Sequence, residues 1–319
     1  QMIAAGCESW DPAESLAVMG LVEPLRHIPR LLRLRRELAR RWIASPPDVF
    51  VGIDAPDFNL GLEKKLRKAG IRTAHYVSPS IWAWRPGRVK KVKKAADTVL
   101  CILPFEPKLY EEHGVNAVFV GHPSAINTPA NIDVQEARRE LRIDSDSVVA
   151  VLPGSRLGEV ARIGGIVADA AALIRAARPN VHFVTPVAAP QLRPLIEEQL
   201  RDAGVSEYFT LVDGSSTQAM AAADIVLMAS GTAVLEAAML PRPAVATYKV
   251  AWLTYLIAIR LGLVKLTHYT LPNLLTEEPL VPEFMQDDAQ PQPIADAVIE
   301  LLDNPQRRQF ISERFARLR

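Results

Sequence analysis

From about residue 48, short apolar runs alternate with segments in which apolar residues recur at helical spacing. Strands are expected at 48–54, 73–78, 98–103 and 117–121, and helices at 59–69, 86–96 and 105–113. Alternation of strand and helix is typical of a parallel sheet with helices packed on it. The pattern therefore predicts a doubly wound α/β domain in the first part of the chain.

A proline-containing stretch at 122–135 interrupts the alternation and is expected to be a linker. The alternation then restarts, with strands expected near 147–152, 181–187, 208–213, 224–229 and 243–248, and helices near 161–177, 190–203, 216–222, 232–240, 251–262 and 293–302. The sequence thus predicts two Rossmann-like α/β domains, 1–123 and 124–319. Such domains bind ligands at the carboxyl ends of their strands, so a cleft between the two is expected to hold the substrate.

Composition is that of a globular protein, with 319 residues, 49% hydrophobic and 23% charged. The net charge of +1 argues against a generally basic nucleic-acid binder. Only Cys7 and Cys101 are present and no Cys/His cluster has metal-ligand spacing, so we expect a reducing compartment, no metal and no cofactor. No signal peptide is visible, and the most apolar run, 250–259, is too short to cross a membrane.

Two glycine-containing turns in the second half directly follow expected strands. They are 152–156 (LPGSR) and 229–233 (ASGTA). Turns of this kind present backbone N–H groups and a fixed cation to a phosphate, so the pair predicts a nucleotide or sugar-nucleotide site. The candidate substrate-binding residues here are Ser155, Arg156, Glu159, Ser230, Gly231, Thr232 and Glu236. The plain alternatives are a surface Arg156 paired with Glu159 and a helix capped by Ser230.

In the first half, the expected strand 48–54 ends at Asp54, which Pro56 follows closely. A carboxylate at the carboxyl end of a strand can act as a general base toward a hydroxyl group, and we assign Asp54 this role. The alternative for the same segment is that Asp57 or Asn59 caps the next helix, and Asp57 is expected to be mainly structural.

Other polar and aromatic residues stand in irregular segments. Ser78 and Trp82 lie in 75–85 (HYVSPSIWAWR), which can wall a sugar or acyl site or simply plug the core. Asn273 and Gln286 stand among apolar neighbours in 270–286, where a loop near the cleft is expected.

The segment 16–42 combines leucine with arginine, and Pro24 and Pro29 are expected to divide it into a short piece and a longer helix. Such a segment can lie in a membrane interface, with leucine among acyl chains and arginine on anionic headgroups. The residues expected to contact lipid are Leu21, Val22, Leu25, Arg26, Leu31 and Leu32. The alternative is an amphipathic helix that packs on the core and exposes its charged face.

Five segments together resemble the lipid-A-disaccharide synthase family, which are inverting glycosyltransferases of the two-domain GT-B type. They are 52–59 (GIDAPDFN), 75–85, 152–156, 229–233 and 271–275 (LPNLL), and their order and spacing match over nearly the whole chain. The resemblance implies transfer of 2,3-diacylglucosamine from UDP to 2,3-diacylglucosamine 1-phosphate. It also implies a peripheral enzyme on the cytoplasmic face of the inner membrane, with a homodimer as a candidate assembly.

Carried onto this sequence, the resemblance implies that Asp54 is the catalytic base, that Arg156 contacts the UDP phosphates and that Asn273 is needed for catalysis. The family's first strand with its Gly-rich loop, and part of its C-terminus, are expected to lie outside this sequence. Ile126 stands where the family usually has Asp. The alternatives are another UDP-sugar enzyme of GT-B type, such as an epimerase, or a non-catalytic lipid- or nucleotide-binding remnant.

Overall fold

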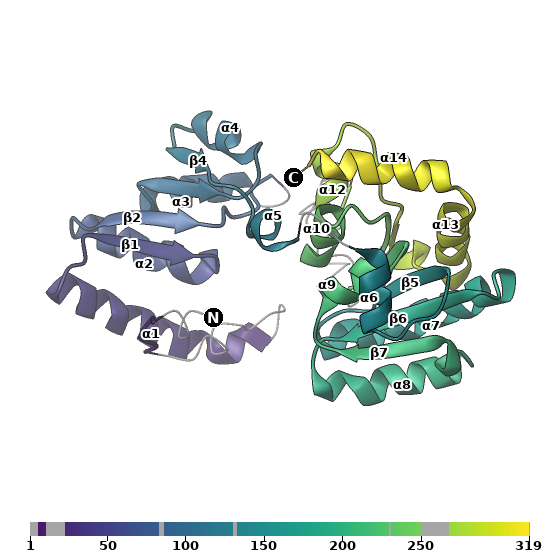
Figure 1. Ribbon diagram of the computed structural model, residues 1–319. Coiled ribbons are helices and arrows are strands. Elements are labelled where there is room, and N and C mark those ends of the chain that lie inside the picture. The colour runs from purple at the N-terminus through teal and green to yellow at the C-terminus, as the bar shows by residue number, and fades with distance from the viewer. Residues whose placement is uncertain are drawn as a thin grey trace. The chain divides into compact units, whose positions relative to one another are not determined.

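A computed structural model describes residues 6–10, 23–82, 86–129, 133–229, 231–250 and 268–318. The described residues form two compact units, one reaching His122 and the other beginning at Pro123 (Figure 1). Each unit has a sheet of its own in which every paired strand is parallel. The α/β class predicted from the alternation is therefore confirmed.

The first unit consists of α1 (Glu23–Ala44), β1 (Val49–Ile53), α2 (Pro56–Lys68), β2 (Arg72–Tyr76), η3 (Pro86–Arg88), α3 (Val89–Ala95), β3 (Thr98–Cys101), α4 (Glu106–Glu111) and β4 (Ala117–Phe119). Its strands follow one another in chain order, β1-β2-β3-β4. Helix α1 packs on α2, and α2 packs on α3. Successive residues of β1 differ in exposure: Gly52 is buried against α2, whereas its neighbours Val51 and Ile53 are nearly half exposed.

The expected break of the first helix at Pro29 is wrong, because α1 continues through this residue. A proline inside a helix removes one backbone hydrogen bond and crowds the preceding turn. In the second half of α1, Ala39 is buried in a cluster with Leu62 and Leu66 of α2, and Trp42 packs against this cluster.

The second unit consists of α5 (Pro123–Asn127), α6 (Val134–Glu140), β5 (Ser147–Leu152), α7 (Leu157–Ala177), β6 (Val181–Val187), η4 (Pro190–Leu192), α8 (Arg193–Asp202), η5 (Ser206–Tyr208), β7 (Phe209–Asp213), α9 (Ser216–Ala222), β8 (Ile225–Ala229), α10 (Thr232–Met239), β9 (Ala244–Tyr248), α12 (Leu271–Leu275), β10 (Glu283–Met285), η6 (Gln286–Asp288), α13 (Pro291–Asp303) and α14 (Pro305–Ala316). The five predicted strands are present, and β10 adds a sixth. The helix expected at 251–262 lies outside the described residues.

The expectation that 122–135 is irregular is wrong, although the boundary between the two units does fall within this stretch, after His122. This stretch contains α5, and α6 begins at Val134. The start of α6 is fixed by Asp133, whose carboxylate accepts hydrogen bonds from the backbone N–H groups of Gln135 and Glu136. Asp133 is thus a helix cap of the ordinary kind, in a segment whose prolines suggested a loop.

The sequences of β5 after Ser147 and of β8 are continuous apolar runs, because the sheet of the second unit is covered on both faces. Helix α7 packs on α8 and on α13 along one layer, whereas α9 contacts α6 and α10 (Figure 1). Val149, Phe183 and Leu227 are completely buried in the main core between these layers.

Candidate functional site

The strand order of the second unit fixes where a ligand is expected to bind. The order is β10-β9-β8-β5-β6-β7, so the chain runs outward from β5 to β7 and then returns to the other side of β5 with β8. In open parallel sheets, ligands bind at the carboxyl ends of the strands beside such a reversal. Leu152 of β5 pairs with Met228 of β8, so the two strands end at the same level of the sheet. The two glycine-containing turns therefore leave the sheet at this position.

The turn after β5 is built around Glu159, in the first turn of α7. One carboxylate oxygen accepts from the backbone N–H of Ser155 at 3.1 Å, and the other accepts from Nη1 of Arg156 at 2.9 Å. Gly154 has a φ of +125°, and a Cβ at this position would lie 2.8 Å from the Cβ of Glu159. Glycine is therefore required here for its conformation and for the close approach of Glu159.

Arg156 lies directly before α7, and its side chain is 57% exposed. The first N–H groups of a helix and its dipole favour an anion at this end. The guanidinium and the helix N-terminus thus present positive charge side by side. The expected pairing of Arg156 with Glu159 is confirmed, and contact of Arg156 with a phosphate stays a prediction.

The ends of β9 and β10 are tied to the same region. Nε of Arg162, on α7, donates to the carbonyl of Lys249 at 3.0 Å. Oε1 of Gln286 accepts from the N–H of Val250 at 2.7 Å, so this oxygen is already used within the protein. Burial raises the pKa of Tyr248, at the end of β9, and the nearby Glu159 raises it further.

The turn after β8 is described only in part. Ser230 lies outside the described residues, as does the side chain of Thr232, whereas Gly231 is exposed directly before α10. Glu236, on α10, is half-buried, and burial raises its pKa while a hydrogen bond with Ser216 lowers it. Contact of these residues with a ribose or phosphate stays a prediction.

Asn273, on α12, is 4% exposed and uses its whole amide inside the protein. Its Oδ1 accepts from the backbone N–H groups of Leu280 and Val281 at 2.8 and 2.9 Å. Its Nδ2 donates to the carbonyl of Val281 at 2.8 Å and to Oε1 of Glu283 at 2.9 Å. Because an amide offers two donors and an oxygen with two lone pairs, these four bonds leave nothing for a substrate. The geometry supports a structural role, and a need for Asn273 in catalysis stays a prediction.

Glu283 is a residue that the sequence pattern missed. Besides Asn273, its carboxylate accepts from the N–H groups of Tyr269 and Thr270 and, at 2.6 Å, from the hydroxyl of Thr270. It thereby joins β10 to the start of α12. The only signal in the sequence was a charged residue beside an apolar segment, which does not reveal its partners.

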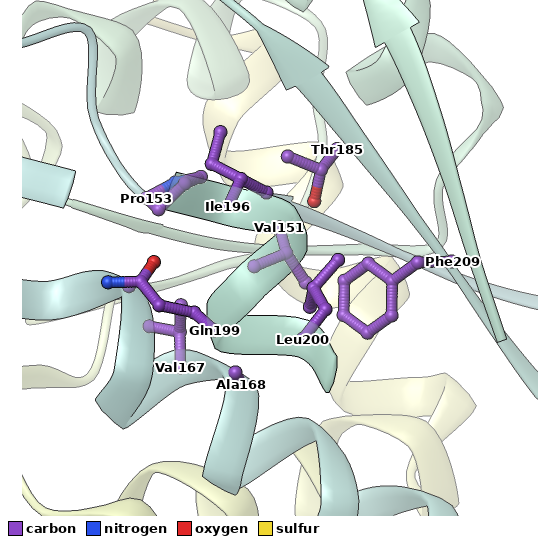
Figure 2. A pocket seen from close by; sticks show the side chains of 10 residues that line it. Val151, Pro153, Val167, Ala168, Thr185, Ile196, Gln199, Leu200 and Phe209 are labelled. Atoms are coloured by element: carbon purple, nitrogen blue, oxygen red, sulfur yellow. The ribbon is translucent and has the colours of Figure 1, made fainter. Parts of the chain in front are cut away.

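A small cavity lies beneath the turn after β5, between the sheet and helices α7 and α8. Figure 2 shows its lining, in which Val151, Leu200 and Phe209 are apolar and Thr185 and Gln199 are polar. Nε2 of Gln199 donates to the carbonyl of Val160 at 3.0 Å. With two polar side chains and no charged one, this cavity does not suit a nucleotide.

In the first unit, Asp54 stands exposed at the carboxyl end of β1. Asp54 and Ala55 both have positive φ, 48° and 41°. A non-glycine residue in this region costs about 1 kcal/mol or more, and such strain clusters at functional sites. The backbone N–H of Asp54 donates to the carbonyl of Tyr76 at 2.8 Å, which ties the turn to β2.

The expectation that Asp57 or Asn59 caps the helix after this turn is wrong. The N-cap of α2 is Ala55, and no side chain caps it. Asp57 instead accepts from Nη2 of Arg88 at 2.7 Å, which agrees with its expected structural role. The amide of Asn59 donates back to the turn.

Ser78 and Trp82 lie in a polar network inside the first unit. The hydroxyl of Ser78 is buried and bonds to the hydroxyl of Tyr110 at 3.0 Å. Nε1 of Trp82 donates to Glu106 at 3.2 Å, and its ring meets the Phe105 ring edge-on. Burial raises the pKa of Glu106, whereas its hydrogen bonds lower it. These contacts support the core-filling alternative, and substrate contact by Ser78 or Trp82 stays a prediction.

The expected lipid contacts are only partly described. Leu21 and Val22 lie outside the described residues, as do the side chains of Leu25 and Arg26. Leu31 and Leu32 are half-buried on α1. The alternative expectation, an amphipathic helix that packs on the core, is confirmed for the second half of α1, which packs on α2. Within the described part of the chain, no helix is long and apolar enough to cross a bilayer.

The chain is similar in sequence to known proteins over almost its whole length. A family model described as lipid-A-disaccharide synthetase matches residues 1–317. The lipid-A-disaccharide synthase of Xanthomonas campestris pv. campestris strain 8004 is 48% identical over 319 residues, which cover 99% of this chain and 73% of that protein. The lipid-A-disaccharide synthase of Burkholderia thailandensis strain E264 is 50% identical over 310 residues, covering 97% of this chain and 79% of that protein.

Solved structures share the fold at low sequence identity. A glycosyltransferase of Rickettsia africae ESF-5 has a TM-score of 0.55 at 10% identity, covering 90% of this chain and 75% of that one. The UDP-GlcNAc 2-epimerase of Neisseria meningitidis, solved with UDP-GlcNAc bound, has a TM-score of 0.54 at 12% identity, covering 93% and 78%. These likenesses concern the fold, and they agree with two Rossmann-like domains of the GT-B type.

Proposed function

The chain belongs to the lipid-A-disaccharide synthetase family, and we propose that it transfers 2,3-diacylglucosamine from UDP to the 6-hydroxyl of 2,3-diacylglucosamine 1-phosphate. The products are the disaccharide 1-phosphate and UDP. The observation that carries the proposal is the turn after β5. It presents Arg156 and the N-terminus of α7 at the reversal of the strand order, where a diphosphate binds in folds of this type.

The reaction is a single displacement at the anomeric carbon of the donor sugar. A bond forms between that carbon and the 6-oxygen of the acceptor, while the bond to the β-phosphate oxygen breaks and its electron pair leaves with UDP. The carboxylate of Asp54 takes the proton of the acceptor hydroxyl. Arg156 and the backbone N–H groups that open α7 stabilise the charge that develops on the departing diphosphate.

Asp54 can act as the base because it is exposed at the end of a strand. Its own backbone is held, since its N–H donates to the carbonyl of Tyr76. Arg156 suits the phosphate because Glu159 orients it without covering it. An ordered but accessible guanidinium loses less conformational freedom on binding than an unrestrained one.

The reaction is tested by mass spectrometry of the protein incubated with UDP-2,3-diacylglucosamine and 2,3-diacylglucosamine 1-phosphate in detergent micelles. A tetraacyl disaccharide 1-phosphate formed in equal amount with UDP supports the proposal. Conversion of the donor sugar without a disaccharide would assign another UDP-sugar reaction. Binding of both substrates without turnover would make the protein a binding module instead.

The protein also binds the surface of an anionic membrane through α1. Arg33, Arg36 and Arg40 are exposed at spacings that place them on one side of the helix, while Leu38 and Trp42 pack toward α2. Arginines near an anionic bilayer each contribute about 1 kcal/mol of attraction, which salt screens.

Sedimentation with vesicles tests the proposed binding of α1 to an anionic membrane. Vesicles that contain anionic lipid are expected to bind the protein, and neutral vesicles to bind it weakly. Replacing Arg33, Arg36 and Arg40 together by Gln is expected to abolish the difference. Equal binding to both vesicle types, or an unchanged difference in the triple variant, would contradict a role for this arginine face.

A further inference from the structure

The turn that carries Asp54 requires contacts that hold it in place. Asp54 and Ala55 are consecutive non-glycine residues with φ of 48° and 41°. L-amino acids avoid this left-handed region, because Cβ approaches the following carbonyl oxygen. A turn of this kind persists only where its surroundings determine its conformation. One side chain, that of Asn59, supplies two contacts to it.

Asn59 lies in the first turns of α2, and its Nδ2 donates to two successive carbonyls. These are the carbonyls of Ile53, at 3.1 Å, and of Asp54, at 2.8 Å. The first carbonyl belongs to the peptide that precedes the Cα of Asp54, and the second belongs to the peptide that follows it. Fixing both peptide planes fixes the backbone angles of Asp54, and with them the direction of its Cα–Cβ bond. The amide of Asn59 therefore sets the direction in which the carboxylate leaves the backbone.

The place of Asn59 is itself determined by close packing of α2 on β1. A Cβ on Gly52 would lie 3.2 Å from the Cβ of Asn59 and 2.0 Å from Oε1 of Glu63. That oxygen bonds to Nδ1 of His75 at 2.7 Å, and both side chains are completely buried. Asn59 and Glu63 are four residues apart and share one face of α2. Gly52 allows that face to approach the strand, which brings the amide within reach of the turn.

We propose that Asn59 is a positioning residue that acts through Asp54. It holds the strained turn so that the carboxylate is aimed at the acceptor hydroxyl before the substrate arrives. This inference rests on the proposed function of Asp54 as the base. Asn59 touches no reacting atom in this account, so its effect is expected on turnover and not on the binding of the donor.

A double-mutant cycle tests the proposal, with kcat and the donor KM measured for Asn59→Ala, Asp54→Asn and the combined variant. Asn59→Ala alone is expected to lower kcat about tenfold, with the donor KM changed by less than about twofold. In the Asp54→Asn background, the same change is expected to lower kcat by no more than about twofold, because no base is left to aim. Asn116→Ala is the matched control, since among the described residues this amide donates to the hydroxyl of Thr98, elsewhere in the same unit.

Two further variants separate positioning from a general loss of structure. Asn59→Asp keeps the size of the side chain and removes its donor, so it is expected to lose kcat as Asn59→Ala does. Ala55→Gly, added to Asn59→Ala, is expected to restore kcat about threefold or more, because glycine accepts the left-handed conformation without a holding contact. Thermal unfolding of each variant establishes that the measured protein is folded.

The outcomes distinguish this inference from the proposed function. If Asp54→Asn is slow and Asn59→Ala and Asn59→Asp turn over at the wild-type rate, the positioning role is overturned and the base remains. If Asn59→Ala lowers kcat equally in both backgrounds, Asn59 is merely structural. If Asp54→Asn itself turns over at nearly the wild-type rate, there is no base to position, and both statements are overturned together.

Discussion

Two turns at the carboxyl ends of parallel strands are built in opposite ways. The turn after β5 uses Gly154 for its left-handed residue and relies on Glu159 to organise Ser155 and Arg156. The turn after β1 places Asp54 and Ala55, two non-glycine residues, in the same region of φ. A glycine turn costs little and presents backbone N–H groups, which suits the binding of an anion.

The role proposed for the strained turn is different. Strain of about 1 kcal/mol or more for each left-handed residue is retained where a side chain must point in one direction. Under the proposed function, the relaxed turn binds the diphosphate and the strained turn carries the base. Substitutions in the two turns are expected to change different quantities.

The largest effect is expected for Asp54→Asn. Loss of the base is expected to lower kcat by about 10²-fold or more, while the affinity for UDP stays unchanged. Steady-state rates and competitive inhibition by UDP measure the two quantities. Asp48→Asn, at the opposite end of β1, is the matched control and is expected to keep wild-type turnover. Near-wild-type turnover of Asp54→Asn would remove the base from the account.

Asn273→Ala is expected to act on stability. It leaves the buried N–H groups of Leu280 and Val281 without their partner and removes one of several donors to Glu283, so the free energy of unfolding is expected to fall by about 3 kcal/mol. Urea denaturation measures this change. Asn304→Ala, which removes an exposed cap of α14, is expected to cost only about 1 kcal/mol. Lost turnover with unchanged unfolding would instead place Asn273 at the substrate.

Arg156→Ala is expected to weaken UDP binding about tenfold, the size of one charge-assisted hydrogen bond. Calorimetric titration with UDP gives the dissociation constant. Arg178→Ala, at the other end of α7 and paired with Asp303, is the matched control and is expected to bind UDP normally. An unchanged affinity of Arg156→Ala would show that the phosphates are held elsewhere.

Gly154→Ala is expected to have the smallest effect, weakening UDP binding by about threefold. The added Cβ would press on Glu159 and strain the turn without removing its charge. Gly165→Ala, within α7 and with open space around it, is expected to leave UDP affinity unchanged and to favour the helix slightly. Equal behaviour of the two variants in a UDP titration would show that the conformation of the turn is unimportant.

The sequence predicted those parts of the fold that depend on local pattern. Strands β5 and β8 were visible because continuous apolar runs are typical of a sheet covered on both faces. Strand β10 was missed because it has three half-buried residues, and only its pairing with β9 makes it a strand. The course of α1 through Pro29 was missed because a proline within a local pattern is a signal for a helix break.

The contacts of the candidate site were also predictable only where they are local in sequence. Neighbours in sequence were predicted correctly, as with Arg156 and Glu159, which are three residues apart. Contacts between distant residues were not, so the partner of Asp57 was missed because Arg88 lies 31 residues away. Asn59 was expected as a possible helix cap. Its bonds to the carbonyls of Ile53 and Asp54 were missed, because they depend on a backbone conformation that non-glycine residues rarely adopt.

The division of work between the two turns is tested most directly by kcat/KM for Asp54→Asn, Arg156→Ala and the variant that combines them. The described residues of the two turns share no hydrogen-bond partner, so the account predicts independent effects. Asp54→Asn is then expected to lower kcat/KM by the same factor, within about twofold, with or without Arg156. Loss of the Asp54→Asn effect in the Arg156→Ala background would contradict the assignment of chemistry to one turn and binding to the other.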